Sequence, residues 1–329
     1  MGVGRLVCTS EFNEDNGKLV KVESFTTDYV TTTRITNRLA VFDVTTPEKY
    51  KVSVISTVTE EINGEPVTRD VVEFEKYYVV NDGQYVEVQV GLDVYSWTGL
   101  KRIVNAHLET EFVESGKLPI GHEVDLTLLD GTHHPMLLAA VNHDTKYYPH
   151  QLIFVSKYLL PELRAMNLTR TMVGGWNDMN LCRELNSARF YTLLPDDCKN
   201  AISERKFYTG AGGSDNIVES EAKIWIPRIY EIIGQAYGGL YKEFAQCEIF
   251  PIFSDKSARV KKLGETGTAS VWLTATNRAN GNYPQITIHV DAAGNHATDA
   301  YWPETVSFGI LPCFHIIADD NPEVILNTT

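Results

Sequence analysis

Histidine and aspartate side chains gather between residues 133 and 150 of the chain. His133, His134, His143 and Asp144 lie close together in sequence, with His150 nearby. Imidazole nitrogens and carboxylate oxygens are good ligands for zinc and other transition metals. Neighbouring side chains on a strand point to opposite faces, so His133 and His134 are poorly placed to share an ion. We therefore expect His143 and Asp144 to hydrogen-bond a tight turn at a strand end, and we expect no bound metal.

The triplet Trp176-Asn177-Asp178 carries oxygen atoms of the kind that calcium prefers. Calcium needs several oxygen ligands, and no Glu-Pro-Asn or Gln-Pro-Asp sequence precedes the triplet. The triplet stands directly before a segment with helical spacing, and Asn and Asp are common caps at such a position. We expect Asn177 or Asp178 to cap this helix, and we expect no calcium-dependent sugar binding.

The cysteines offer a possible nucleophile. There are five, widely spaced and without a CxxC pair, which argues against a zinc ribbon or a redox pair; they are Cys8, Cys182, Cys198, Cys247 and Cys313. Cys313 stands two residues before His315, inside the apolar stretch ILPCFHII. A cysteine buried in such a strand is normally an inert small hydrophobe. We expect reduced, mostly buried thiols and no catalysis at Cys313.

Carboxylates are abundant, but their spacing singles out no pair. A glycosidase needs two carboxyl groups held about 5–10 Å apart, one of them with a raised pKa. The chain has 43 acidic residues, and nothing in the sequence distinguishes two of them. A glycan or cell-wall hydrolase therefore stays a weaker alternative, and the sequence predicts a protein that is not an enzyme and uses no cofactor.

Asparagine and aromatic residues cluster between residues 276 and 304, in what read as loops between short strands. Tyr and Trp supply large rigid contact surfaces and Asn supplies adaptable hydrogen bonds, as in antibody paratopes. These residues are candidates for binding a ligand or partner: Asn277, Arg278, Asn280, Asn282, Tyr283, Asn295, His296, Tyr301 and Trp302. Equally open is the reading that the turns are ordinary and the aromatic side chains pack in the core or against a neighbouring subunit.

Composition and charge exclude several classes. The 329 residues are 43% hydrophobic and 22% charged, which is typical of globular domains. The net charge of −14 argues against nucleic acid or an anionic membrane as a partner. The N-terminus lacks a basic-then-apolar signal, and no apolar run approaches the ~20 residues of a membrane helix. We expect synthesis in a bacterial cytoplasm and no membrane insertion.

The coarse organisation is two-part. Residues 1–95 are rich in Val, Thr and Tyr at period-two spacing, which favours strands separated by Gly-containing turns. The turn at Asn63-Gly64 predicts a hairpin, and the whole region predicts an antiparallel β-sandwich. Residues 96–329 alternate between strands and short helical stretches. We expect an α+β domain whose twisted antiparallel sheet is assembled from both ends of this region.

Several blocks of the second region resemble phage and prophage virion proteins of gut Firmicutes that carry a C-type-lectin-like domain. The stretch 174–202, beginning GGWNDMNLCRELN, is similar to the family's GGW-x-x-S-x-L-R-x-x-L-N block. SVWLTAT and FGILPCF resemble its closing W-L-R-S and G-V-R-P-x-F signatures. Further blocks lie at 96–108, 118–124, 139–144, 224–234 and 288–295. Both signature arginines are missing here, since WLTA replaces WLRS and Leu311 precedes Pro312.

The resemblance implies a C-type-lectin-like domain at residues 96–329, preceded by a β-rich attachment or oligomerisation module at 1–95. It implies a structural protein of a bacteriophage virion, as the receptor-binding or adhesion part of a tail fibre, baseplate or head fibre. We expect a homotrimer that contacts other virion proteins through the first module. A host surface glycan or protein would bind to the loops of residues 276–304. The alternative is a purely architectural tail or capsid decoration protein.

Overall fold

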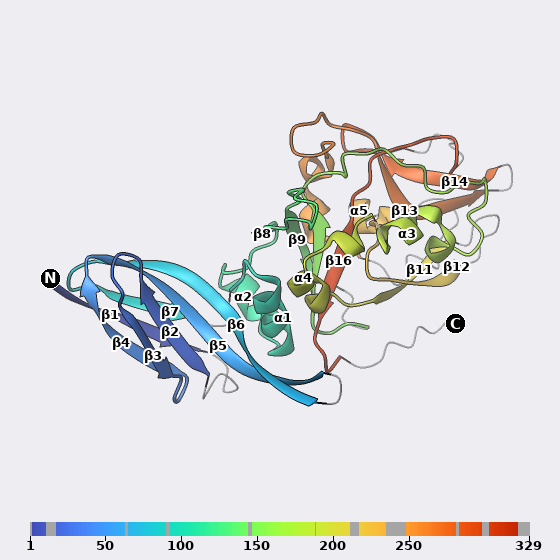
Figure 1. The fold of residues 1–329 in the computed structure, drawn as a ribbon. Coiled ribbons are helices and arrows are strands. Elements are labelled where there is room, and N and C mark those ends of the chain that lie inside the picture. Colours follow the sequence, from blue (N-terminus) through green and yellow to red (C-terminus); the bar gives the residue numbers. More distant parts are fainter. Residues whose placement is uncertain are drawn as a thin grey trace. The chain divides into compact units, whose positions relative to one another are not determined.

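The computed structural model shows a mixed α+β chain built mainly from antiparallel sheets, with five short α-helices among the described residues (Figure 1). None of the helices among the described residues is long and apolar enough to cross a membrane. The structure describes residues 2–10, 18–62, 65–89, 93–143, 147–187, 189–210, 217–234, 248–280, 283–297 and 303–321.

The chain divides into two compact units. Unit 1 comprises Met1–Val94 with Thr98–Arg102, and unit 2 comprises Tyr95–Trp97 with Ile103–Thr329. The division at Val94 adjoins the boundary expected at residue 95, and the residues of helix α1 (Trp97–Asn105) are divided between the two units.

Unit 1 consists of two sheets. One has the strand order β4-β1-β7, formed by β1 (Gly2–Thr9), β4 (Leu39–Thr46) and β7 (Tyr85–Gln89). The other has the order β3-β2-β5-β6. Its strands are β2 (Leu19–Ser24), β3 (Val30–Arg34), β5 (Glu48–Ile62) and β6 (Glu65–Val80).

Both sheets of unit 1 contribute side chains to a single core. Leu6 and Phe42 from the first sheet are buried together with Val20 and Val52 from the second. Strand β4 alternates strictly between exposed and buried residues, as a strand with one face on the core must. The period-two pattern read from the sequence is therefore the pattern of burial.

The hairpin expected around residues 63 and 64 is present. Strands β5 and β6 pair from Glu48↔Val80 to Ile62↔Glu65, while Asn63 and Gly64 themselves lie outside the described residues. The expectation of a wholly antiparallel unit is wrong at one place, because β1 and β7 pair in parallel. Neighbouring strands in this pair are far apart in sequence, so no local turn signal announces their direction.

The helices of unit 2 are short. After α1 they are α2 (Glu109–Glu114), α3 (Asn180–Leu185), α4 (Asp196–Ala201) and α5 (Ile229–Ile233). Helices α1 and α2 are separate, since His107 between them adopts the left-handed conformation with φ of 57°. Pro195 stands at the N-cap of α4.

The central sheet of unit 2 joins the beginning and the end of this part of the chain. Its strands, β8 (Glu123–Val124), β9 (Met136–Val141), β10 (Gln151–Ser156) and β16 (Cys313–Ile317), lie in the order β16-β10-β9-β8. β16 and β10 are antiparallel, with Gln151 opposite Ile317 and Val155 opposite Cys313. In Figure 1 the red strand β16 runs among green strands from much earlier in the chain. Pairing of the two ends is therefore confirmed.

The strands that carry the closing blocks SVWLTAT and FGILPCF lie in two different sheets, so the expectation that one sheet contains both strands is wrong. β13 (Trp272–Asn280), β14 (Tyr283–Val290) and β15 (His296–Ala297) form a sheet of their own. An isolated parallel bridge between Trp272 and Gly309 connects it to the segment before β16. β11 (Arg205–Gly210) pairs only with β12 (Ile217–Ala222) among the described strands. The sequence pattern identifies strands, but it does not show which distant strands pair with one another.

Three charged side chains are buried together where β11 meets α5. Arg205 Nη1 and Arg228 Nη2 donate to the same oxygen of Glu231, over 2.9 and 2.7 Å, and all three side chains are at most 1% exposed. The other Glu231 oxygen accepts from the backbone N–H of Arg228. Burial raises the pKa of Glu231, but the guanidiniums of Arg228 and Arg205 outweigh it and lower the value to about 2. Glu231 is therefore ionised and compensates two buried cations.

Replacing Glu231 by Gln leaves two buried guanidiniums without a counter-charge. We expect the free energy of unfolding of unit 2 to fall by about 3–5 kcal/mol. All five tryptophans lie in unit 2, so tryptophan fluorescence during urea denaturation reports on that unit. The control Glu219→Gln changes an exposed carboxylate on β12 and should stay within about 0.5 kcal/mol of the wild type. Equal effects of the two substitutions would contradict the role given to Glu231.

Candidate functional site

Four of the predicted binding residues lie in paired strands, not in loops. Asn277 stands opposite Thr287, Arg278 opposite Ile286, and Asn280 opposite Tyr283 in the hairpin of β13 and β14. Loop placement was expected because Asn is depleted in strands. The ladder of β13 continues through these residues all the same, since cross-strand hydrogen bonds override a weak local propensity.

The next two predicted residues lie at the turn after β14. The exposed Asn295 donates its side-chain amide to Asp291 Oδ2 over 2.9 Å, and its backbone N–H to Asp291 Oδ1 over 2.8 Å. His296 begins the short strand β15 opposite Val290. Asn295 therefore has a structural role in this turn. Asn282, Tyr301 and Trp302 lie outside the described residues.

The histidines between residues 133 and 150 have separate surroundings. His133 is 47% exposed and its ring nitrogen contacts Asp125, whereas the neighbouring His134 is 3% exposed. The expectation that these two point to opposite faces is confirmed. His143 packs edge-on against Phe250, and Asp144 lies outside the described residues.

His150 belongs to yet another group of side chains. Its Nδ1 lies 2.8 Å from Glu109 Oε1, and its ring stacks on His107 with centroids 3.6 Å apart. Within the described ranges, no group of three His, Cys, Asp or Glu side chains is placed to hold a metal ion.

The triplet at residue 176 forms a 3-10 turn, Trp176–Asp178, instead of capping a helix. Helix α3 begins at Asn180 and its N-cap residue is Met179, so the expected capping by Asn177 or Asp178 is wrong. Asn177 Oδ1 instead accepts the backbone N–H of Glu221 over 2.9 Å. The side chain thus ties this turn to β12.

Cys313 and His315 are both completely buried on β16. The Cys313 thiol donates to the backbone carbonyl of Leu311, and His315 Nε2 donates to the carbonyl of Glu204 over 3.2 Å. Burial raises the pKa of the Cys313 thiol well above its usual range. Since the thiolate is the nucleophile, this site disfavours the reactive form.

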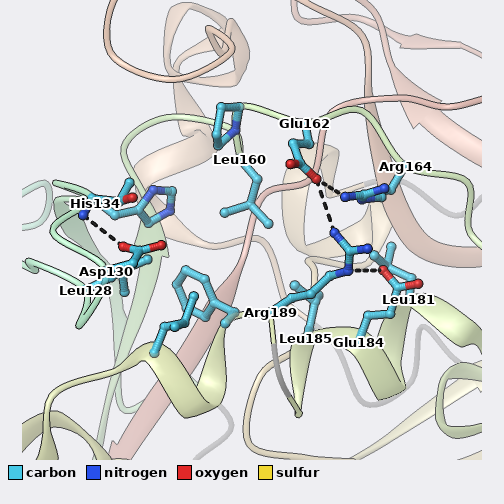
Figure 2. A pocket seen from close by; sticks show the side chains of 14 residues that line it. Leu128, Asp130, His134, Leu160, Glu162, Arg164, Leu181, Glu184, Leu185 and Arg189 are labelled. Carbon is cyan, nitrogen blue, oxygen red and sulfur yellow. Dashed lines mark hydrogen bonds and ion pairs between the residues drawn. The ribbon is translucent and has the colours of Figure 1, made fainter.

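The structure also shows a pocket of about 300 Å³ that no sequence pattern indicated (Figure 2). Three stretches of chain build it. Leu128–His134 forms a turn at the positive-φ Gly131, and Leu129 donates to the carbonyl of Leu193. Leu160–Arg164 follows β10 and is tied by backbone hydrogen bonds to residues 308 and 310. Helix α3 and residues 189–193 complete the walls.

The pocket combines buried apolar side chains with charged ones. Leu181, Leu185 and Phe190 are at most 2% exposed and line it. At one edge Arg189 contacts both Glu162 and Glu184, over 3.1 and 2.9 Å. Figure 2 shows this charged set on one side of the pocket, with Asp130 and His134 on the other.

Arg164 also pairs with Glu162, so the same carboxylate joins two guanidiniums. These charged residues come from separate stretches of the sequence, which explains why no spacing rule reveals them.

No family model matches the sequence, and no curated protein matches it. One solved structure is matched: a crystal structure described as a "putative carbohydrate binding protein" from Pseudomonas aeruginosa, 14% identical, covering 27% of this chain and 87% of that chain. The TM-score is 0.19, so this likeness supports no assignment of fold or function.

Chemical labelling can test whether the cysteine thiols are buried in the native protein. Cys8, Cys182, Cys198 and Cys313 are all buried, and Cys247 lies outside the described residues. In a Cys247→Ser variant we expect maleimide labelling at pH 7 to be negligible in the native protein and to reach four thiols in denaturant. Mass spectrometry counts the adducts. Rapid native labelling of Cys313 would restore it as a candidate nucleophile.

The buried His134 should make the stability of the fold depend on pH. Burial lowers its pKa from 6.5 to about 4, its ring packs edge-on against Phe190, and its Nε2 lies 2.7 Å from Ser156 Oγ. Between these pH values the unfolded chain binds a proton that the folded chain does not, so stability falls as the pH decreases. The full effect is about 3 kcal/mol between pH 7 and pH 4.

The measurement is urea denaturation followed by tryptophan fluorescence at pH 7, 5.5 and 4.5. His134→Gln should flatten the decline, while the control His133→Gln, at a half-exposed neighbour, should keep the wild-type slope. An unchanged slope in His134→Gln would show that other groups cause the decline.

Proposed function

We propose that this chain is a non-enzymatic protein of a bacteriophage virion that binds a partner non-covalently through unit 2. The observation that carries the proposal is the pairing of β10 with β16, which brings the two ends of the motif-bearing region into one sheet. A C-type-lectin-like domain closes in this way. The closing blocks SVWLTAT and FGILPCF end in β13 and β16, both in unit 2.

Unit 1 suits the attachment module of such a protein. Two sheets over one core favour a small β-sandwich, and its described side chains form no chemical cluster beyond surface ion pairs and hydrogen bonds. In the proposed arrangement this unit contacts other virion proteins and mediates trimer formation.

The proposed contact surface comprises the hairpin of β13 and β14 with Asn295 and His296, and the sequence prediction adds Tyr301 and Trp302, which lie outside the described residues. Backbone pairing between the two strands orders the chain before binding, which lowers the entropic cost of binding. The architectural alternative keeps the same surface and places it against a neighbouring subunit. The two alternatives differ in whether the isolated protein binds cells.

Binding of the full-length protein to immobilised cell-envelope fractions of gut Firmicutes tests the proposal. We expect saturable binding that falls at least tenfold on combining Arg278→Ala, Tyr301→Ala and Trp302→Ala, since aromatic and Arg anchors dominate interfaces. The matched control Tyr85→Ala with Tyr95→Ala removes two exposed aromatic side chains elsewhere and should bind as the wild type.

Other outcomes separate the alternatives. Release of soluble sugar or peptide from the envelopes would favour a hydrolase. Absence of binding, together with failed particle assembly for the triple variant, would favour the architectural role.

A further inference from the structure

The outward face of strands β1 and β4 in unit 1 carries apolar side chains in contact with solvent. Val3 on β1 and Leu39 and Val41 on β4 are 65%, 43% and 45% exposed. The residues that alternate with them on each strand are buried, so these three side chains share the face that points away from the core. A sheet with one face on the core normally carries polar side chains on the other.

The strand register places an ion pair in the middle of this face. Arg5 stands opposite Asp43, and Arg5 Nε lies 2.8 Å from Asp43 Oδ1. Both charged side chains are more than half exposed. At the next outward position along the strands, Val7 stands opposite Val41. The face therefore carries one positive and one negative charge side by side, with apolar side chains around them.

The outward face of the other sheet in unit 1 is covered by charged groups. Lys51 there contacts Glu23 and Glu75, over 3.2 and 3.5 Å. Lys49 Nζ lies 4.8 Å from the centroid of the Phe25 ring, so an ammonium group covers an exposed aromatic side chain. Removing several charges from water is expensive, so the face of β1 and β4 is the better candidate for a buried contact.

We propose that a second copy of this chain packs on this surface, the β1–β4 face, formed by Val3, Arg5, Leu39, Val41 and Asp43. A two-fold axis that runs along the strands, between β1 and β4, lays β1 of each copy over β4 of the other. Arg5 then faces Asp43 of the second copy. Sheets that pack face to face commonly keep their strand directions within about 30° of each other, and this arrangement satisfies that condition.

The charges of the β1–β4 face favour a second copy over another partner. A partner surface of a single sign places a like charge against either Arg5 or Asp43. A second copy supplies both signs in reverse order, so four charges alternate across the interface. The net charge of −14 argues against a nucleic acid as the partner.

This contact goes beyond the proposed function, because it is additional to a trimer. A two-fold contact joins copies in pairs, so the assembly contains an even number of chains. The number is two if unit 1 forms no trimer and six if two of the proposed trimers pair. Halving of the assembly therefore reports on the β1–β4 face, whereas the number of chains that remains together reports on the trimer.

Size-exclusion chromatography with light scattering, applied to the full-length protein at micromolar concentration, counts the chains. We expect an even number in the wild type and half that number in Val41→Lys, because each copy then brings an ammonium group into the apolar part of the interface. The matched control Val79→Lys changes a valine that is 57% exposed on the outward face of the other sheet, and it should keep the wild-type mass. Circular dichroism checks that each variant is folded.

Charge reversal tests whether the β1–β4 face is its own complement. Arg5→Asp places only carboxylates at the centre of the interface, so it should also halve the mass. Combining Arg5→Asp with Asp43→Arg restores alternating charges and should restore the wild-type mass. This rescue separates a lost contact from a misfolded unit, since the double variant contains the first substitution.

An odd number of chains in the wild type, an unchanged mass in Val41→Lys, a halved mass in Val79→Lys, or absence of rescue by the double variant would each overturn the inference. Failure of the proposed function gives a different result, namely no binding to cell envelopes while the mass still halves. The hairpin variants of unit 2 leave the β1–β4 face unchanged, so the two experiments are independent.

Discussion

The antiparallel pairing of β10 with β16 is the constraint on which unit 2 depends. Five residue pairs, from Gln151↔Ile317 to Val155↔Cys313, join segments about 160 residues apart in sequence. The intervening chain must therefore leave the sheet and return to it. Isolated bridges from Ser203 to His315 and from Trp225 to Cys313 attach the middle of the chain to the same strand. β16 is thus the common partner of three separate parts of unit 2.

The buried Arg205–Glu231–Arg228 group holds the middle of the unit at a considerable electrostatic cost. Removing three charges from water is expensive, and their mutual attraction offsets that cost only with close hydrogen bonds. Here both guanidiniums share one carboxylate, and each also lies over an aromatic ring, Arg205 on Trp225 and Arg228 on Phe207. The group links β11 to α5 through two short contacts to one carboxylate.

Different interactions hold the hairpin of β13 and β14 and the pocket of unit 2 in place. The hairpin of β13 and β14 is held together by backbone pairing, with register shifts between Leu273 and Asn277 and between Arg278 and Asn280. The pocket depends on backbone ties between distant segments, such as Arg164 to Phe308 and Leu160 to Ile310. These ties end on the residues that lead into β16. The pocket therefore depends on the position of the segment that leads into β16.

The sequence by itself determined what depends on near neighbours. Period-two patterning specified the strands of unit 1, the Asn63-Gly64 signal located the turn between β5 and β6, and apolar surroundings predicted the burial of Cys313. Only the tertiary structure decided which strands pair, that Asn177 bonds to β12, and that Glu162, Glu184 and Arg189 meet at one pocket. The reason is physical: local propensity acts over a few residues, whereas pairing and charge contacts depend on segments that only folding brings together.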